Sequence, residues 1–457
     1  MSNPPDHATH LGELAGRARR FTERGRNAEA RDAWLEFLSL SPGDRLALNN
    51  LGTLLHGMGY RTAARTAYEE AVARHPDDPM SRVNLANVLH EKGEETAARE
   101  HYEAALAADP DFAEAHQGLS YVLAELGERE QADYHRRRGF QNRAVITMPY
   151  RGEGPPVSLL LLISSFGGNI PTRNFLDDRV FAVTVILPEF HDRTRPLPPH
   201  QFIFNAIGDA DLADESLAAA QALVARSDAP VLNSPAAVRL TTRSGNAARL
   251  CGIEGMIAPQ TQTAPRDAAG PAWDPPYPVL LRTPGFHTGR HFVKVDRAED
   301  LEAAKAGLPG ERLTAIQYLD ARGADGKSRK YRVMMIGGEL YPLHLAISSD
   351  WKIHYFTAEM AENAAHRAED AAFLNDMPGV LGPRAMQALR RIQQTLGLDY
   401  AGIDFGLSPS GEILFFEANA TMVVNPPEPG GKWAYRRPAV ERIFTAVRKT
   451  LAGNVRT

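Results

Sequence analysis

The sequence predicts a multidomain fold in which an all-α solenoid of helical repeats is followed by an α/β domain and then by an α+β domain. Three observations support this prediction. Glycine recurs every 34 residues in the first third of the chain. Apolar, strand-like runs alternate with a helical pattern in the middle third. Strand-like runs joined by turns that contain glycine fill the last third.

The first third of the chain repeats itself with a fixed period. Three residue types recur in step, at Gly25, Gly59, Gly93 and Gly127; at Pro42, Pro76 and Pro110; and at Ala30, Ala64, Ala98 and Ala132. A period of 34 residues is typical of helical hairpins that stack into a solenoid. Glycine permits the turn between the two helices, and proline ends the second helix. We expect four units, which begin near Leu11, Arg45, Pro79 and Ala113.

The second unit, from Arg45 to Asp78, has the clearest pattern of small and large residues. Its characteristic positions are Leu51-Gly52, Leu55, Ala64, Tyr68, Ala71 and Pro76. In this pattern the region resembles the tetratricopeptide repeat family. The first unit departs from it with Arg17-Ala18 in place of the Leu-Gly pair, and the fourth ends early, after Gly139. The resemblance implies a concave surface that receives peptides or proteins. A dimerisation or docking module remains an equal alternative.

Composition excludes several classes of protein. A chain of 457 residues is long enough for two to four domains. The net charge of -5 and the pI near 6.3 give no general attraction to nucleic acid or to anionic membranes. Cys251 is the only cysteine, which excludes a disulfide framework, and we expect it to be a small buried side chain. No signal-like or membrane-spanning run is evident, so we expect a cytoplasmic protein.

The middle third predicts an open α/β domain. Four strands are expected, at Val157–Ile163, Phe181–Leu187, Gln201–Ile207 and Pro230–Asn233, and one helix at Leu212–Ser227. The loop Ser164–Asn169 follows the first strand, where such folds bind ligands; a simple turn is the alternative. With the remaining boundaries, the expected organisation is a flexible N-terminus at 1–10, helical repeats at 11–140, a linker at 141–156, the α/β domain at 157–262 and the α+β domain at 263–457.

The segment from Tyr400 to Asn425 organises the last third. It is expected to form two strands joined by a turn at 408–411. In a simple hairpin Leu407 faces Glu412, and Asp404 faces Phe415. Because side chains alternate along a strand, one face then carries Gly402, Asp404, Gly406, Phe415, Glu417 and Asn419. The opposite face is apolar, with Ile403, Phe405, Leu407, Leu414, Phe416 and Ala418.

Two carboxylates and an amide on one face suggest a site for Mg²⁺. Asp404, Glu417 and Asn419 supply hard oxygen ligands, and Mg²⁺ is commonly bound by one or two carboxylates together with substrate phosphates. Mn²⁺ is an alternative ion. An ordinary amphipathic hairpin is the alternative to a metal site, and the pairing register decides between them, because a slip of one residue reverses the faces of a strand.

The strands that precede this hairpin extend the pattern. Pro278–Val295 is expected to form two strands around a glycine-containing loop, Leu313–Asp320 a further strand, and Lys330–Ile336 a hairpin with Glu339–Ile347. With the GIDFGLSPSGEILFFEANA segment that follows, this order resembles the ATP-grasp superfamily, from about Val157 to the C-terminus. The resemblance implies ATP binding, with Asp404, Glu417 and Asn419 as ligands of the Mg²⁺ ions that bridge the phosphates.

The same resemblance implies further site residues. Arg282 occupies the place of a phosphate-binding lysine, and a guanidinium offers a planar fork instead of a point charge. The glycine loop contributes Gly285, Gly289 and Arg290, and the adenine hinge contributes Gln317, Tyr318, Leu319 and Asp320. Arg332 matches a cation near the transferred phosphate. The usual later arginine of the family is not evident, and Lys352 is the expected substitute.

The resemblance implies an ATP-dependent carboxylate-amine ligase that works through an acyl phosphate. Its small-molecule substrates are a carboxylate and an amine, and a protein partner is expected on the repeats. A second hypothesis makes the acceptor a peptide or protein that the repeats recruit. A third is a repeat scaffold with a catalytically weakened ATP-binding module, which is supported by Arg282 in place of lysine and by the altered segment from Leu343 to Phe356. Neither nucleic acid nor membrane is expected as a partner.

Overall fold

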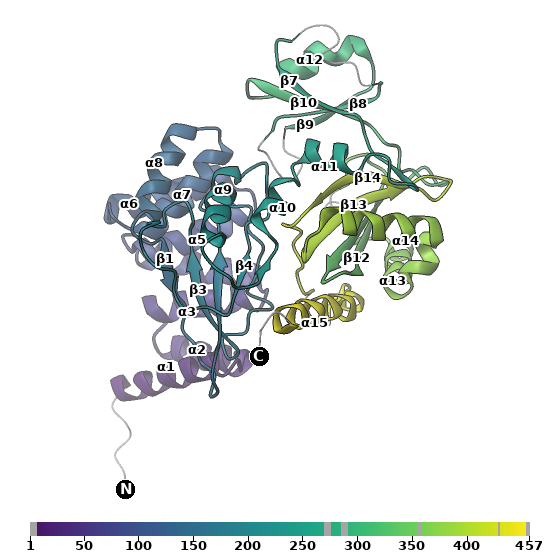
Figure 1. Ribbon diagram of the computed structural model, residues 1–457. Coiled ribbons are helices and arrows are strands. Elements are labelled where there is room, and N and C mark those ends of the chain that lie inside the picture. The colour runs from purple at the N-terminus through teal and green to yellow at the C-terminus, as the bar shows by residue number, and fades with distance from the viewer. Residues whose placement is uncertain (1–6, 269–275, 285–290, 354–357, 428–429, 454–457) are drawn as a thin grey trace. The chain divides into compact units, whose positions relative to one another are not determined.

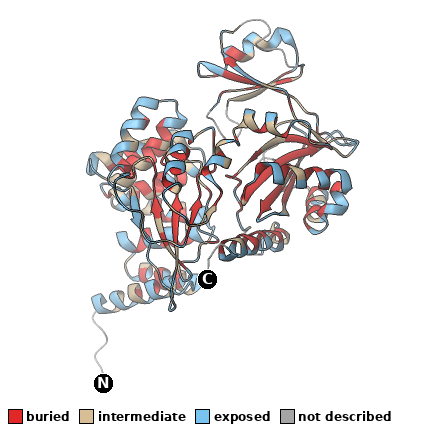
Figure 2. Cartoon of the chain, viewed as in Figure 1, coloured by how far each residue is buried: buried red, intermediate tan, exposed pale blue. Residues whose placement is uncertain are grey.

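The computed structural model describes residues 7–268, 276–284, 291–353, 358–427 and 430–453. Two compact units divide the chain, Met1–Ala144 and Val145–Thr457 (Figure 1). Each unit has its own hydrophobic interior. In Figure 2 the central strands of the C-terminal unit and the inward faces of the N-terminal helices are largely buried.

The described part of the N-terminal unit contains eight helices. They are α1 (His7–Glu23), α2 (Asn27–Leu40), α3 (Arg45–Gly57), α4 (Arg61–Arg74), α5 (Pro79–Glu91), α6 (Glu95–Ala108), α7 (Ala113–Glu125) and α8 (Arg129–Phe140). Three of the four predicted unit starts are confirmed, and α1 begins at His7, inside the stretch expected to be flexible. The four periodic glycines all have positive φ, between 70° and 89°, which confirms their role in the turns.

Ion pairs join neighbouring repeats with the period of the sequence. Arg65 Nη1 lies 2.6 Å from Glu94 Oε1, and Arg99 Nη1 lies 2.6 Å from Glu128 Oε1. Both members of each pair are partly exposed, so a pair contributes at most about 1 kcal/mol to stability. The pairs therefore contribute more to the choice of which helices lie side by side than to the stability of the repeat array.

Two tyrosines pack against glycines in different ways. A Cβ added to Gly52 would lie 2.5 Å from the ring of Tyr68 in the same repeat. The residue that corresponds to Gly52 in the third repeat is Ala86, and Tyr102 packs instead against the following repeat, where a Cβ on Gly118 would lie 2.2 Å from its ring. Both tyrosines are buried, so each needs a residue without a side chain beside it.

A pair of histidines links the two helices of the last repeat. Nδ1 of His116 lies 2.7 Å from Nδ1 of His135, and Nε2 of His116 donates to the carbonyl oxygen of Pro110 at 3.0 Å. With Nε2 protonated, the neutral His116 ring accepts at Nδ1, so His135 donates there. Burial, together with each ring's positively charged neighbour Arg138, lowers the pKa of both rings, and that of His135 falls to about 4.

The N-terminal unit is expected to lose stability as the pH falls from about 6.5 to about 4. The folded pKa of His135 lies below the unfolded value, so the unfolded chain binds more protons in this window. The loss is on the order of 2 kcal/mol. Hydrogen exchange of α7 and α8, corrected for intrinsic rates, measures it. His135→Gln should flatten the pH dependence, whereas His7→Gln, at an exposed position of α1, should not; equal slopes in the two variants would contradict the assignment.

The C-terminal unit begins with a five-stranded sheet. Its strands are β1 (Val145–Thr147), β2 (Val157–Leu162), β3 (Phe181–Ile186), β4 (Phe202–Asn205) and β5 (Val231–Leu232), in the order β1-β3-β2-β4-β5. All pairs are parallel except β1 with β3, and α9 (Asp214–Val224) follows β4. These positions confirm the four predicted strands. β1 lies in the stretch expected to be a linker.

Two antiparallel sheets complete the unit. One consists of β7 (Thr261–Pro265), β10 (Arg312–Gln317), β8 (Val279–Arg282) and β9 (Phe292–Val295), in that order. The other has β12 (Glu339–Ser348), β11 (Ser328–Ile336), β13 (Tyr400–Leu407) and β14 (Ile413–Asn419), with the short strand β6 (Met256–Ile257) parallel to β14. β7 crosses the boundary expected at 262/263, in a proline-rich stretch that sequence periodicity did not identify as a strand.

Helices cover one face of the second antiparallel sheet. They are α13 (Ala364–Asn375), α14 (Met377–Leu396) and α15 (Arg437–Gly453). Earlier in the chain, α11 (Arg243–Leu250) also contacts the sheet, at β14, whereas α10 (Pro235–Arg239) packs on α9 and α12 (Leu301–Ala306) on β9. Short 3₁₀ turns precede α12 (Ala298–Asp300) and α15 (η3, Ala434–Arg436). Tyr331 stacks on Phe405 at 5.5 Å and meets Phe373 of α13 at 5.1 Å. The face with Tyr331 and Phe405 is therefore the core face.

Two further observations concern the single cysteine and the length of the apolar helices. Cys251 is exposed, so the expectation of a buried side chain is wrong; it follows the end of α11, where the chain turns at the surface. Among the described residues, no helix is long and apolar enough to cross a bilayer.

Candidate functional site

One residue from each of four adjacent strands forms a row across the face opposite the core. His344 of β12 faces Arg332 of β11, Arg332 also faces Asp404 of β13, and Asp404 faces Glu417 of β14. Directly opposed residues of antiparallel strands project from the same face. Three strand pairings thus bring together residues that are far apart in the sequence. The predicted proximity of Asp404 and Glu417 is confirmed by the observed register.

The register itself differs from the one expected for a simple hairpin. Leu407 pairs with Ile413, not Glu412, and a bulge at Phe416 moves the partner of Asp404 from Phe415 to Glu417. Phe415 consequently pairs with Phe405 and is buried on the core face. A second bulge interrupts the β11–β12 pairing beside Arg332. Bulges reorient side chains and often lie next to functional sites, and here both flank the row.

Two cations hold the carboxylate of Asp404. Arg332 donates through Nε to Oδ1 at 2.6 Å and through Nη2 to Oδ2 at 2.8 Å, and Lys330 Nζ lies 3.1 Å from Oδ2. The side chain of Asp404 is only 2% exposed. Burial alone would raise the pKa of Asp404, but Arg332 and Lys330 outweigh burial and keep the pKa well below its usual range. Asp404 is therefore an ionised group inside the protein.

Glu417 has a counter-ion of its own. Its Oε2 lies 2.6 Å from Nη2 of Arg243, the first residue of α11. Burial raises and Arg243 lowers the pKa of Glu417, with a net decrease. Arg282 of β8 lies near Arg243 and Glu417, and burial is the main cause that lowers its pKa to about 10. Glu417 thus lies where two arginines converge, one of them the predicted phosphate-binding residue.

The loop after β4 approaches the same region. Asp211 accepts from the backbone N–H of Arg243 at 2.9 Å. A Cβ on Gly208 would lie 2.8 Å from Cγ2 of Thr421, just beyond β14. β2 lies between β3 and β4, so the carboxyl ends of β2 and β4 form the topological switch point of the parallel sheet, where open α/β folds bind ligands. This switch point therefore adjoins the residues that follow Glu417.

Asn419 lies on the same strand and opposite Gly402. Its Oδ1 accepts from the backbone N–H of Thr421 at 3.0 Å and from the Thr421 hydroxyl at 2.9 Å. These two bonds engage both lone pairs of the oxygen, so Asn419 could bind a metal ion only if a bond to Thr421 were released. Within the described residues, no group of three His, Cys, Asp or Glu side chains is placed to hold a metal ion. A site here requires the amide as its third ligand.

The predicted adenine hinge follows β10. The backbone N–H of Gln317 donates to Gln260 at 2.8 Å and that of Tyr318 to Pro278 at 3.2 Å, so both are engaged within the protein. Both carboxylate oxygens of Asp320 accept from Arg322, at 2.6 to 3.0 Å. Leu319, between them, is half-buried. These contacts give no support to Asp320 as a ribose ligand.

The hinge nevertheless ends at the face of the sheet that carries Asp404. A Cβ on Gly406 would lie 2.5 Å from the Cβ of Ala321, the residue after Asp320, and 3.1 Å from the ring of Phe416. Gly406 is two residues beyond Asp404 on β13 and so shares its face. The hinge and the candidate metal ligands therefore border the same surface.

The remaining predicted residues fall into two groups. Gly285, Gly289 and Arg290 lie outside the described residues. Lys352 follows Trp351, whose ring meets Phe292 of β9 at 5.3 Å, and the Arg282 guanidinium lies 5.8 Å from the same Phe292 ring. The segment after β12 thus reaches the strand pair that carries Arg282. This places the backbone of Lys352 near the predicted phosphate-binding strands, without a contact to Asp404.

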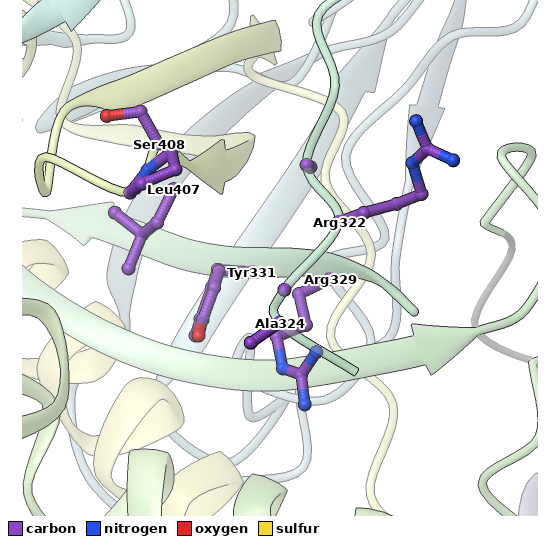
Figure 3. A pocket seen from close by; sticks show the side chains of 9 residues that line it. Arg322, Ala324, Arg329, Tyr331, Leu407 and Ser408 are labelled. Atoms are coloured by element: carbon purple, nitrogen blue, oxygen red, sulfur yellow. The ribbon is translucent and has the colours of Figure 1, made fainter. Parts of the chain in front are cut away.

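A separate pocket lies away from this site. A cavity of about 490 Å³ lies between the loop 321–324 and the turn 407–409 (Figure 3). Tyr331 and Arg329, which line it, alternate along β11 with Lys330 and Arg332 and so belong to the core face. Its lining is largely apolar, and none of the row of four residues contributes to it.

Three contributors to the site were missed by sequence reasoning. Lys330 had a usable signal, because it is two residues before Arg332 in a predicted strand and must share its face. Arg243 and His344 had none. Arg243 is brought in from a helix start far from the hairpin, and His344 faces Arg332 only because of the bulge at Leu343 within the predicted pairing of β12 with β11.

The comparisons with known proteins concern the repeats. Residues 57–113 and 93–132 match the model of the tetratricopeptide repeat family. The predicted repeats are thereby confirmed for this part of the chain. No curated protein matches the chain in sequence.

Similar solved structures cover less than a third of this chain. MamA is 21% identical, with a TM-score of 0.27, over 29% of this chain and 77% of its own. A tetratricopeptide repeat protein from Parabacteroides merdae ATCC 43184 is 21% identical, with a TM-score of 0.27, over 29% and 53%. The first such domain of Spaghetti (RPAP3), bound to an HSP90 peptide, is 17% identical, with a TM-score of 0.25, over 26% and 93%.

Proposed function

We propose that the C-terminal unit is an ATP-dependent carboxylate-amine ligase of the ATP-grasp type and that the repeats serve protein interaction. The row of Arg332, Asp404 and Glu417 across three strands is the main support. It combines two ionised carboxylates with cations on a face bordered by the hinge. Such a combination suits a nucleotide phosphate chain and its metal ion.

The chemistry of the residues present fits Mg²⁺ and ATP. Asp404, Glu417 and Asn419 would hold the ion, whose charge would offset that of the phosphates. The cations now paired with the carboxylates are Lys330, Arg332 and Arg243, and Arg282 lies beside them. With Mg²⁺ held by the carboxylates, these cations would be available to bind phosphate oxygens. Charge balance in this buried site is thus kept with and without the nucleotide.

The proposed reaction requires no nucleophilic side chain. A carboxylate oxygen of the substrate attacks the γ-phosphorus of ATP, and ADP leaves. The amine nitrogen of the acceptor then attacks the acyl carbon, phosphate leaves, and the nitrogen loses a proton. Arg332 and Arg282 contribute by orienting phosphate oxygens and by stabilising the charge that develops on them. Lys352 remains a proposed contributor through its position after β12.

Two other candidate functions have specific support. The family match of residues 57–132 favours a peptide or protein acceptor that the repeats recruit. The full occupation of Asp404 by Arg332 and Lys330, with Arg282 in place of lysine, favours an ATP-binding scaffold without ligase activity. A scaffold would bind Mg-ATP and release no ADP with any acceptor. Recruitment would make turnover on a protein acceptor depend on residues 1–144.

Calorimetry and ADP release test the proposal. The full chain is titrated with ATP in the presence and absence of Mg²⁺, and ADP release is then followed with amino acids, short peptides and proteins. Magnesium-dependent ATP uptake and acceptor-dependent ADP release are expected. Absence of ATP uptake with Mg²⁺ would overturn the proposed function, and uptake without release would leave the scaffold.

A further inference from the structure

Side chains hold the edge strand β12 on both sides of His344. The carbonyl oxygen of Leu343 accepts from Nη2 of Arg436 at 3.0 Å, and the backbone N–H of Leu345 donates to Oδ1 of Asp370 at 2.7 Å. β12 has a neighbouring strand on one side only. These two bonds therefore supply partners that an adjacent strand would otherwise provide.

The groups that make these bonds form a buried cluster from the C-terminal part of the chain. Asp370 of α13 is 0% exposed and Arg436 is 8% exposed. The Tyr435 hydroxyl donates to Oδ2 of Asp370 at 2.5 Å, and Nε of Arg436 lies 3.7 Å from the same oxygen. We call Asp370, Tyr435 and Arg436 the edge clamp.

The clamp acts where the strand pairing is irregular. Arg332 pairs with His344, whereas Val333 pairs with Pro342, so Leu343 is the extra residue of the bulge. An extra residue interrupts the local ladder, so the pairing with β11 alone holds the strand less firmly at this point. Bonds to Leu343 and Leu345, one on each side of His344, hold it from the other edge. The position of the imidazole thus depends on Arg436 and Asp370.

His344 in turn lies near two arginines. It faces Arg332 across the β11–β12 pairing, and its ring is within electrostatic reach of Arg332 and Arg436. The side chain is buried, so it limits the space open to Arg332 on that side. On the other side Arg332 forms a bidentate pair with the carboxylate of Asp404, through Nε and Nη2. A contiguous chain of groups therefore joins the edge clamp to Asp404.

We infer that the edge clamp positions His344 and, through it, sets the place of Arg332 on Asp404. Asp370, Tyr435, Arg436 and His344 are then positioning residues of the candidate nucleotide site. The inference rests on the proposed function for the ligand concerned. The segment just before α15, far in sequence from Arg332, thereby controls how well the site accepts Mg-ATP.

The test compares two arginines near the C-terminus of the full chain. Arg436→Gln removes a bond to the Leu343 carbonyl, and Arg442→Gln removes the same kind of bond, to the Leu374 carbonyl at 2.9 Å. Arg436→Gln should weaken Mg-ATP binding about tenfold and Arg442→Gln should leave it unchanged. Tyr435→Phe, which removes only the hydrogen bond to Asp370, should also weaken Mg-ATP binding. Arg436→Lys should bind Mg-ATP more tightly than Arg436→Gln.

Imidazole NMR supplies a readout that loss of stability alone does not move. The His344 signals, assigned with His344→Gln, should shift in Arg436→Gln and in Arg332→Gln but not in Arg442→Gln. Unshifted His344 signals in folded Arg436→Gln, or equal loss of Mg-ATP affinity in both arginine variants, would overturn the inference. If the wild-type chain takes up no Mg-ATP, the proposed function fails, and the NMR comparison still decides whether the clamp positions His344.

Discussion

Replacing Asp404 with asparagine is expected to lower the free energy of unfolding of the C-terminal unit by about 3 to 5 kcal/mol. Asp404 is 2% exposed and compensates both Arg332 and Lys330. The amide carries no charge, so two cations would remain buried without a counter-ion. Urea unfolding followed by the exchange protection of β11 and β13 measures the loss.

A second change separates the charge effect from a loss of packing. Asp404→Asn combined with Arg332→Gln should recover part of the lost stability, because one of the two uncompensated cations is removed with its partner. If Asp404→Asn alone were as stable as the wild-type chain, the buried ion pair would contribute nothing to the free energy of unfolding. Nucleotide binding by Asp404→Asn is consequently a poor test of metal ligation, because misfolding and ligand loss coincide.

Replacing Glu417 with glutamine is expected to abolish magnesium-dependent ADP release at a small cost in stability. The side chains of Glu417 and Arg243 are 27% and 30% exposed, and pairs of this kind contribute at most about 1 kcal/mol. Glutamine keeps the size of the side chain but removes the charge that Mg²⁺ requires. ADP release with a productive acceptor, and calorimetry with Mg-ATP, provide the measurements.

Glu412→Gln is the matched control for this variant. Glu412 lies in the turn of the same hairpin, where it accepts from Arg384 at 2.8 Å, away from the row of four residues. It should retain wild-type ADP release. Full activity in Glu417→Gln, or the same loss in both variants, would remove Glu417 from the set of metal ligands.

The sequence predicted three of the four repeat starts and the shared face of Asp404 and Glu417 correctly, for different reasons. The repeats rest on local spacing, which a helical hairpin preserves. The prediction of the shared face is correct although the expected register was wrong at two points. The turn is one residue longer than expected, and the bulge at Phe416 shifts the register by one further residue. Side chains alternate with a period of two, so a combined shift of two residues restores the same face.

What the sequence could not predict are contacts between distant segments. The pairing of Asp404 with Arg332 depends on which strand lies beside β13, and Glu417 with Arg243 depends on a helix from the middle of the chain. The bulge at Leu343, which sets the place of His344, has no local signal. Strand alternation places Lys330 on the same face as Arg332, so that residue could have been predicted from the sequence although it was not.

The two tyrosine–glycine contacts make the repeat array directional. Tyr68 finds its space on Gly52 within its own repeat, whereas Tyr102 finds it on Gly118 of the next. The third repeat therefore has to be followed by one with glycine at that position, and a second copy of the third repeat would present Asn84 there instead. A duplicated third repeat would therefore cause a steric clash with Tyr102. The ion pairs between repeats would not prevent such a duplication.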